Sequence, residues 1–375
     1  MMGAMSEPTA QDHPDLPQPA RGVLDDLAAS PTPYHAVDRA ERLLLDAGFR
    51  PIDGAEPLPS EPGPYVVSRA GSLIAWIQGT AHRGFTVVGA HTDSPNLRVK
   101  TRADVTSVGI HQIGVEIYGG VLLNSWLDRG LGLAGRVTLR SDDGPAETRL
   151  VLDDRPVMIV PQLAIHLDRD AVTSGLKLDP QRHLVPMWAL DDAATGQDDP
   201  AGSGTDTDAD EGEDPGRLRR HVAGLLDVDP NRILAWDLMA FDTQAPAIIG
   251  RDGDLFSSGR IDNLLSSFCG VRALTKLVGQ EAARTPVLAL YDHEEIGSSS
   301  ATGAAGSLLA SMLERIAAAE SASRPEFLAA LNRSVVISAD GAHATHPNYP
   351  DRHEPSHRIG LNQGVVIKRN ANQRY

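Results

Sequence analysis

The chain has 375 residues, 41% of them hydrophobic, and a formal net charge of −16 at pH 7. This length predicts one large or two moderate domains, and no apolar run approaches the roughly 20 residues that a membrane span needs. A single cysteine, Cys269, excludes an internal disulfide and a cysteine-based zinc site. With neither a membrane span nor a disulfide expected, we expect a cytoplasmic protein with no membrane partner.

The N-terminal part of the chain predicts a leader, a helix and three strands. Residues 1–22 are polar and proline-rich, without the apolar core of a secretory signal, and we expect a disordered leader there. Ser30–Pro33 then marks a helix start, and apolar residues at helical spacing continue to Gly48, which closes the helix. Short strands broken by glycine are expected at residues 65–68, 72–77 and 85–93.

The middle of the chain predicts a separate β-rich domain, residues 95–240, because short alternating runs dominate it. Within it, Asp191–Asp214 carries ten acidic residues and no basic one. This stretch has almost no large apolar side chains to bury, so we expect residues 191–216 to form a disordered acidic loop. The rest of the chain is only mildly acidic, which argues against a nucleic-acid partner.

From residue 241 onward, helical and strand patterns alternate. Helices are expected at residues 260–278 and 307–320, and strands at residues 287–292 and 334–340. Such alternation predicts a sheet with helices on both faces. The simplest architecture is a discontinuous α/β domain, residues 23–94 and 241–375, with the β-rich domain inserted into it.

Four groups of polar residues follow the expected strands or begin an expected helix. They are His91 with Asp93, Asp262, Glu294 with Glu295, and Asp340 followed by His343. Open α/β sheets bind ligands outside the carboxyl ends of their strands, so these groups can converge. Histidine and carboxylates without thiolates suit Zn²⁺, Mn²⁺ or Co²⁺. Each motif alone is more often a packed histidine or a solvated turn, but four along one α/β pattern favour a metal site.

The residue types also suggest roles within such a site. Two ions about 3.5–4 Å apart need a bridging carboxylate, and Asp262, a short side chain beside a helix start, is the best candidate. His91 and Asp93 face the same way on a strand, so Asp93 can accept a hydrogen bond from the ring nitrogen that does not bind metal. Glu294 and Glu295 point in different directions, so one would bind metal and the other act as general base; their spacing leaves open which is which.

These residues resemble those of the M18 metallopeptidases, the aspartyl aminopeptidases. The resemblance covers nearly the whole chain outside the leader and the acidic loop, and it implies a metal-dependent N-terminal exopeptidase with two divalent ions per subunit, usually zinc. It also implies a phosphorylase-like, zinc-exopeptidase-like α/β catalytic domain, a β-rich dimerisation domain, peptide substrates and a homo-oligomer built from dimers, a dodecamer in the family. The similarity is carried by "ASPTPYHAV", "GAHTDSPNLRVK", "GGVLLNSWLDRGLGLAGRV", "PQLAIHLDR", "DTQAPAIIG", "SSGRIDNLLSSF", "YDHEEIGSSSATGA", "SADGAHATHPNYPDRHEP" and "LNQGVVIKRNANQRY".

Carried over by matching motif, the resemblance assigns the individual residues. It implies that Glu294 is the general base and that Asp93 orients His91. His166, in "LAIHLDR", matches a histidine that is either a zinc ligand or a group reaching a neighbouring subunit's active site. The metal ligands that it implies are His91, Asp262, Glu295 and Asp340.

The resemblance also implies a preference for N-terminal Asp or Glu, which requires a cation in the specificity pocket. Lys368 and Tyr375 match the residues of that pocket, and His343 is expected to assist.

One departure concerns the end of the sequence. The family pattern continues beyond "NQRY" with further helix and strand and a last metal-binding histidine, so we expect this chain to be C-terminally incomplete and weakened at one metal site. Two alternatives therefore stay open: a catalytically impaired remnant that keeps the fold and the oligomer, and another co-catalytic metal amidohydrolase such as a deacylase or carboxypeptidase.

Overall fold

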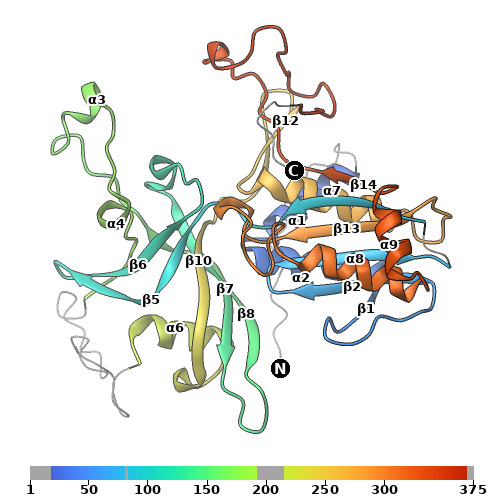
Figure 1. Cartoon of the computed structure of the whole chain (residues 1–375). Helices are drawn as coiled ribbons and strands as arrows, with labels where there is room; N and C mark the ends of the chain where they lie inside the picture. Colours follow the sequence, from blue (N-terminus) through green and yellow to red (C-terminus); the bar gives the residue numbers. More distant parts are fainter. Residues whose placement is uncertain (1–17, 81–82, 192–214, 370–375) are drawn as a thin grey trace.

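A six-stranded sheet and a closed barrel of six strands lie side by side in the molecule (Figure 1). The structure, a computed structural model, describes residues 18–80, 83–191 and 215–369. The strand order of the sheet is β1-β2-β3-β13-β4-β14. Its strands are β1 (Arg50–Pro51), β2 (Gly63–Arg69), β3 (Ser72–Gln78), β4 (Phe85–His91), β13 (Thr285–Tyr291) and β14 (Val335–Ser338).

The order of these strands creates one edge where several chain segments meet. β4 pairs in parallel with β13 on one side and with β14 on the other, whereas β3 pairs with β13 in the antiparallel direction. The carboxyl ends of β4, β13 and β14 therefore lie next to one another.

Helices cover both faces of the sheet, as the alternating pattern predicted. On one face, α1 (Gln18–Ala28), α2 (Pro33–Asp46) and α7 (Ile261–Thr275) bury apolar residues such as Leu27, Leu44 and Phe268. On the other face, α8 (Leu308–Ala319) and α9 (Arg324–Leu331) pack against the rings of Trp76 and Phe85. All seven residues of β13 are buried, which explains why its sequence is a continuous apolar run rather than an alternating one.

A buried ion-pair network ties the three helices of the first face together. Asp26 of α1 is fully buried, and its two carboxylate oxygens pair with Arg39 of α2, at 2.9 Å, and with Arg272 of α7. A buried carboxylate is tolerated only with such partners, so Asp26 fixes α1 on α2 and α7.

The barrel has the strand order β10-β5-β6-β9-β8-β7. Its strands are β5 (Asn96–Ser107), β6 (Ile110–Tyr118), β7 (Gly130–Leu139), β8 (Glu147–Ile159), β9 (Met187–Leu190) and β10 (Ile233–Asp242). Its core includes Leu97, Ile113 and Leu131, and α6 (Arg217–Leu226) adds Leu218 and Val222.

Short elements connect these parts. They are η1 (Leu123–Trp126), α3 (Ala171–Ser174), α4 (Pro180–His183), η2 (Pro230–Arg232), β11 (Ala247–Ile249), β12 (Leu255–Ser257), η3 (Glu294–Ile296) and η4 (Pro350–Arg352). Among the described residues, no helix combines the length and hydropathy that a bilayer span requires.

Two details differ from the sequence-based expectations. Helix α1 begins at Gln18, so residues 18–22, expected in a disordered leader, are helical, because Leu24 and Leu27 of this helix bury themselves in the core beneath it. Among the short alternating runs of the β-rich domain, "RLVLDD" and the "VMI" of "VMIV" belong to one long strand, β8, rather than to two short ones. The remaining segments expected to be disordered, residues 1–17 and 192–214, lie outside the described residues.

Candidate metal centre

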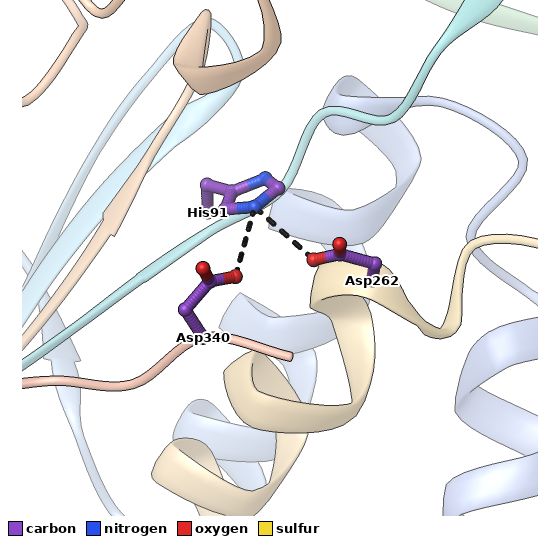
Figure 2. A group of neighbouring side chains, drawn as sticks. All are labelled: His91, Asp262 and Asp340. Atoms are coloured by element: carbon purple, nitrogen blue, oxygen red, sulfur yellow. Dashed lines mark ion pairs between the residues drawn. The ribbon is translucent and has the colours of Figure 1, made fainter. Parts of the chain in front are cut away.

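Three side chains from distant parts of the sequence meet at the carboxyl edge of the sheet (Figure 2). His91 is the last residue of β4, Asp262 lies in the first turn of α7, and Asp340 follows β14. The Nε2 atom of His91 is 3.5 Å from Asp262 Oδ1 and 3.7 Å from Asp340 Oδ1. The parallel pairing of β4 with β14 brings His91 and Asp340 to the same edge.

A second group shares His91 and includes the two glutamates that follow β13. Glu294 Oε2 is 3.8 Å from His91 Nε2. Both glutamates belong to the short helix η3, but Glu294 is exposed whereas Glu295 is half-buried. The two neighbours thus have different surroundings.

Asp93 lies behind His91 and contacts the ring from the opposite side. It is fully buried, its Oδ1 atom is 3.3 Å from His91 Nδ1, and its backbone carbonyl accepts from the same nitrogen at 3.0 Å. The Nδ1 atom therefore faces Asp93, and Nε2 is left to face the other carboxylates. In this way the ring orientation is set by contacts outside the group of potential ligands.

Hydrogen bonds between segments hold the backbone of this centre in place. The hydroxyl of Ser94 donates to the carbonyl of Asp262 at 3.0 Å, and the Ser267 hydroxyl donates to the carbonyl of His91 at 2.8 Å. The side-chain amide of Asn263 donates to the carbonyl of Ala339 at 2.8 Å. Helix α7 is thereby fastened to the ends of both β4 and β14.

Crowding of negative groups shifts the pKa values at this centre. Burial lowers the pKa of His91, but its hydrogen bond to Asp93 and the negative charges of Asp93 and Glu294 outweigh burial and raise the pKa to about 9. Burial raises the pKa of Glu295 to about 7, and the charges of Asp93 and Glu294 add to this effect. These shifts indicate a site that is short of positive charge.

The other two carboxyl groups are affected in opposite directions. Burial and the nearby charge of Asp340 raise the pKa of Asp262. Burial opposes ionisation of Asp340 as well, but the Lys368 ammonium group, 3.4 Å from Asp340 Oδ2, outweighs burial and lowers the pKa of Asp340.

A divalent ion fits this set of donors. Ligand atoms bound tetrahedrally to zinc at about 2.1 Å are about 3.4 Å apart, close to the separations between His91 Nε2 and the carboxylate oxygens. In each of the two groups, the potential ligand atoms lie within 4.8 Å of one another. An imidazole nitrogen with several carboxylate oxygens is also the donor chemistry that zinc, manganese and cobalt accept.

The remaining residues expected in the site are not part of these two groups. His166 is exposed in the segment that follows β8. Lys368 donates to the carbonyl of Gly341 at 2.7 Å, in addition to pairing with Asp340. His343 is exposed, and its charge interaction with Asp262 opposes the rise in the pKa of that carboxyl. Tyr375 lies outside the described residues.

Sequence reasoning missed several groups that support the centre. Besides Ser94, Asn263 and Ser267, the hydroxyl of Tyr118 contacts Asp93 at 2.8 Å. Tyr118 ends a strand of the barrel, where a tyrosine is common, so its sequence carries no signal of a role at the sheet.

Comparison with known proteins gives the family. Residues 27–375 match the model of the aminopeptidase I zinc metalloprotease (M18) family. The chain is 48% identical over 364 residues to a probable M18 family aminopeptidase 2 of Streptomyces avermitilis, covering 95% of this chain and 79% of that protein.

Solved structures agree with this match. A chain of the cryo-EM structure of the Ape4 and Nbr1 complex superposes with a TM-score of 0.85 at 36% identity, covering 94% of this chain and 69% of that chain. The mApe1 dodecamer of S. cerevisiae superposes with a TM-score of 0.77 at 28% identity, covering 92% and 77%. By its sequence and its fold, the chain belongs to the M18 family of zinc metalloproteases and is a metallo-aminopeptidase, a hydrolase of peptide bonds.

Proposed function

We propose that this aminopeptidase removes N-terminal residues, preferentially Asp and Glu, with the help of two divalent ions, in the first instance Zn²⁺. One observation carries the proposal: His91 Nε2 faces carboxylate oxygens from three separate segments, which form two groups that share this histidine. The residues that would hold the ions are His91, Asp262, Glu295 and Asp340, with Asp262 as the bridging ligand.

Glu294 is the general base of the proposed mechanism. Bound divalent ions polarise a carbonyl group and make water more acidic, which prepares both partners of the hydrolysis. Glu294 then takes a proton from the attacking water molecule and passes it to the nitrogen of the leaving peptide. Its exposed carboxylate can reach the substrate, and its backbone N–H is held by Asp93 Oδ1 at 3.1 Å.

Lys368 supplies the preference for acidic residues. Its ammonium group lies beside Asp340 with its side chain half-exposed, so a carboxylate of the substrate's first residue can approach it. A charge-assisted hydrogen bond of this kind favours Asp and Glu over neutral residues. His343 and Tyr375 are the other residues that we assign to this pocket.

The chain also acts as a homo-oligomer in this proposal, built from dimers as in a dodecamer. The related mApe1 of S. cerevisiae is a dodecamer. Here, exposed apolar side chains flank His166, namely Leu163, Ile165 and Leu167. A second copy would cover them, and His166 would then serve the neighbouring subunit rather than its own. We keep the cytoplasm as the expected compartment.

The test is a substrate and metal survey of the full chain. The purified protein, supplied with zinc, manganese or cobalt, is assayed on Asp- and Glu-anilides, on Leu- and Lys-anilides, and on Asp peptides with a free or acetylated N-terminus. We expect cleavage of the acidic anilides and of the free peptide, with two metal ions per chain by elemental analysis. Cleavage of the acetylated peptide would instead indicate a deacylase or carboxypeptidase, and fewer than two tightly bound ions would indicate an impaired remnant.

A further inference from the structure

The barrel contributes one side chain directly to the surroundings of the metal centre. Tyr118, the last residue of β6, donates its hydroxyl to Asp93 Oδ2 at 2.8 Å. Tyr118 is 5% exposed and Asp93 is fully buried, so the bond is shielded from water. A hydrogen bond from a hydroxyl to a buried carboxylate is short and strong in such surroundings.

Asp93 connects this hydroxyl to both groups of potential ligands. Its Oδ1 atom faces His91 Nδ1 and accepts from the backbone N–H of Glu294. Its Oδ2 atom accepts from the backbone N–H of Glu295 at 3.1 Å and from Tyr118. A rotation of this one carboxylate would therefore disturb the imidazole ring and the backbone of both glutamates together.

The tyrosine itself is held firmly. The guanidinium group of Arg98 lies over the ring, 4.4 Å from its centroid, and Asn96 pairs with Tyr118 in the barrel. The next residue, Gly119, has a φ of +77°, and a Cβ atom there would lie 3.0 Å from the Cβ of Glu295. The end of β6 is thus packed against the metal centre, so the direction of the Tyr118 hydroxyl is set before any ion binds.

We propose that Tyr118 is a positioning residue of the metal centre: through Asp93, its hydroxyl holds the His91 ring and the Glu294–Glu295 backbone in the arrangement that binds metal. This inference rests on the proposed dinuclear site, and it adds a role for the barrel within a single subunit. Tyr118 does not touch the substrate in this account, so its loss should affect metal binding and turnover rather than substrate binding.

The experiment compares Tyr118→Phe with a matched control in the full chain. Tyr65→Phe removes the same atom from another buried tyrosine, whose hydroxyl donates to the carbonyl of Glu61 at 3.0 Å, far along the sheet in β2. The measurements are zinc affinity by chelator competition, the visible absorption spectrum of the Co²⁺ form, kcat and KM, and the melting temperature of the metal-free protein.

We expect Tyr118→Phe to weaken zinc binding by about 10- to 100-fold, the usual effect of removing an outer partner of a metal ligand. The Co²⁺ spectrum should change and kcat should fall, with KM close to that of the wild type. Tyr65→Phe should match the wild type in zinc affinity, Co²⁺ spectrum and kcat. In the metal-free state, the melting temperatures of the two variants should fall by similar amounts. Equal zinc affinity and an unchanged Co²⁺ spectrum in Tyr118→Phe would overturn the inference.

A rescue variant separates the hydrogen bond from the packing of the ring. 4-Aminophenylalanine at position 118 restores a donor at the same place, and we expect it to recover most of the zinc affinity. Weak binding in this folded variant would also overturn the inference. If Tyr118→Phe does not fold, the comparison of zinc affinity between the 4-aminophenylalanine variant and the wild type is the test.

If the wild type itself binds no metal and cleaves no peptide, the proposed function fails and the inference fails with it. A loss of metal binding confined to Tyr118→Phe leaves the proposed function intact.

Discussion

Glu294 and Glu295 are adjacent in sequence but differ in what surrounds them. Glu295 is half-buried, and burial together with nearby carboxylates raises its pKa to about 7, which suits a group that exchanges its proton for a cation. Glu294 is exposed, with its carboxylate near His91 Nε2. This difference supports Glu295 as ligand and Glu294 as base.

The first prediction concerns the base. Glu294→Gln should lower kcat by about 10²- to 10⁴-fold, since glutamine cannot accept the proton, while KM and zinc content stay near the wild-type values. Steady-state kinetics and elemental analysis check this. Glu281→Gln, the same change at an exposed position before β13, should have no effect. Loss of one zinc ion from Glu294→Gln would contradict the division of roles.

The second prediction concerns specificity. Lys368→Met should lower kcat/KM for an Asp-anilide by about 10- to 100-fold, the usual contribution of a hydrogen bond between charged groups, and leave kcat/KM for a Leu-anilide nearly unchanged. Lys276→Met, at an exposed lysine that caps the end of α7, is the control. Because Lys368 also pairs with Asp340, zinc content is measured alongside. An equal loss on both substrates would refute the specificity role.

At the scale of elements, the start of α2 contains a buried histidine that must stay neutral. His35 lies in the first turn, and its Nδ1 atom is 2.8 Å from the hydroxyl of the N-cap residue Thr32. Burial, together with the positive charges of Arg260 and Arg42, lowers the pKa of His35 to about 4. Since the unfolded chain has a histidine pKa near 6.5, acid favours the unfolded state.

The third prediction follows from this pKa. The stabilising contribution is complete above pH 6.5 and is lost progressively as the pH falls from 6.5 towards 4. Between pH 7 and pH 5, the wild type should lose about 2 kcal/mol more unfolding free energy than His35→Gln, which has no group to protonate there. Denaturant unfolding of the zinc-loaded proteins measures the difference. Parallel pH profiles for the two proteins would mean that the pKa of His35 is the same in the folded and unfolded states.

At the scale of the whole molecule, the candidate metal centre joins β4, β13, β14 and α7, which lie far apart in the sequence. Without a cation, burial raises the pKa values of Asp262 and Glu295, and the negative charges of neighbouring carboxylates add to this effect. A bound ion should therefore stabilise the arrangement of the sheet edge as well as serve the reaction.

The fourth prediction is that metal removal destabilises the fold. Zinc at a thousand times its dissociation constant should add about 4 kcal/mol to the unfolding free energy, and a chelator should remove this gain. Melting curves with and without zinc provide the measurement. His91→Ala, which removes the residue shared by both groups, should show a much smaller zinc effect. An equal effect in this variant would mean that zinc binds elsewhere.

Much of the fold follows from local sequence alone. Helix α2 has apolar residues at helical spacing, with prolines at its start and Gly48 just after its end. The apolar run "VLALY" predicts a buried strand. The strand-end positions of His91, Glu294 and Asp340 were likewise visible in the sequence, because an abrupt change from apolar to charged residues is a local signal. Such patterns depend only on neighbours along the chain, so the sequence by itself determined the α/β class and the candidate ligands.

Other features were decided by contacts between distant segments. Leu24 and Leu27 make α1 a helix by packing on the core, and the continuity of β8 depends on its partners in the barrel. His166 is not part of either group of potential ligands in its own chain. Its place depends on where the barrel lies beside the sheet. The bond from Tyr118 to Asp93 has no sequence signal at all, because a hydroxyl becomes a partner only when two folded parts meet with their side chains in register.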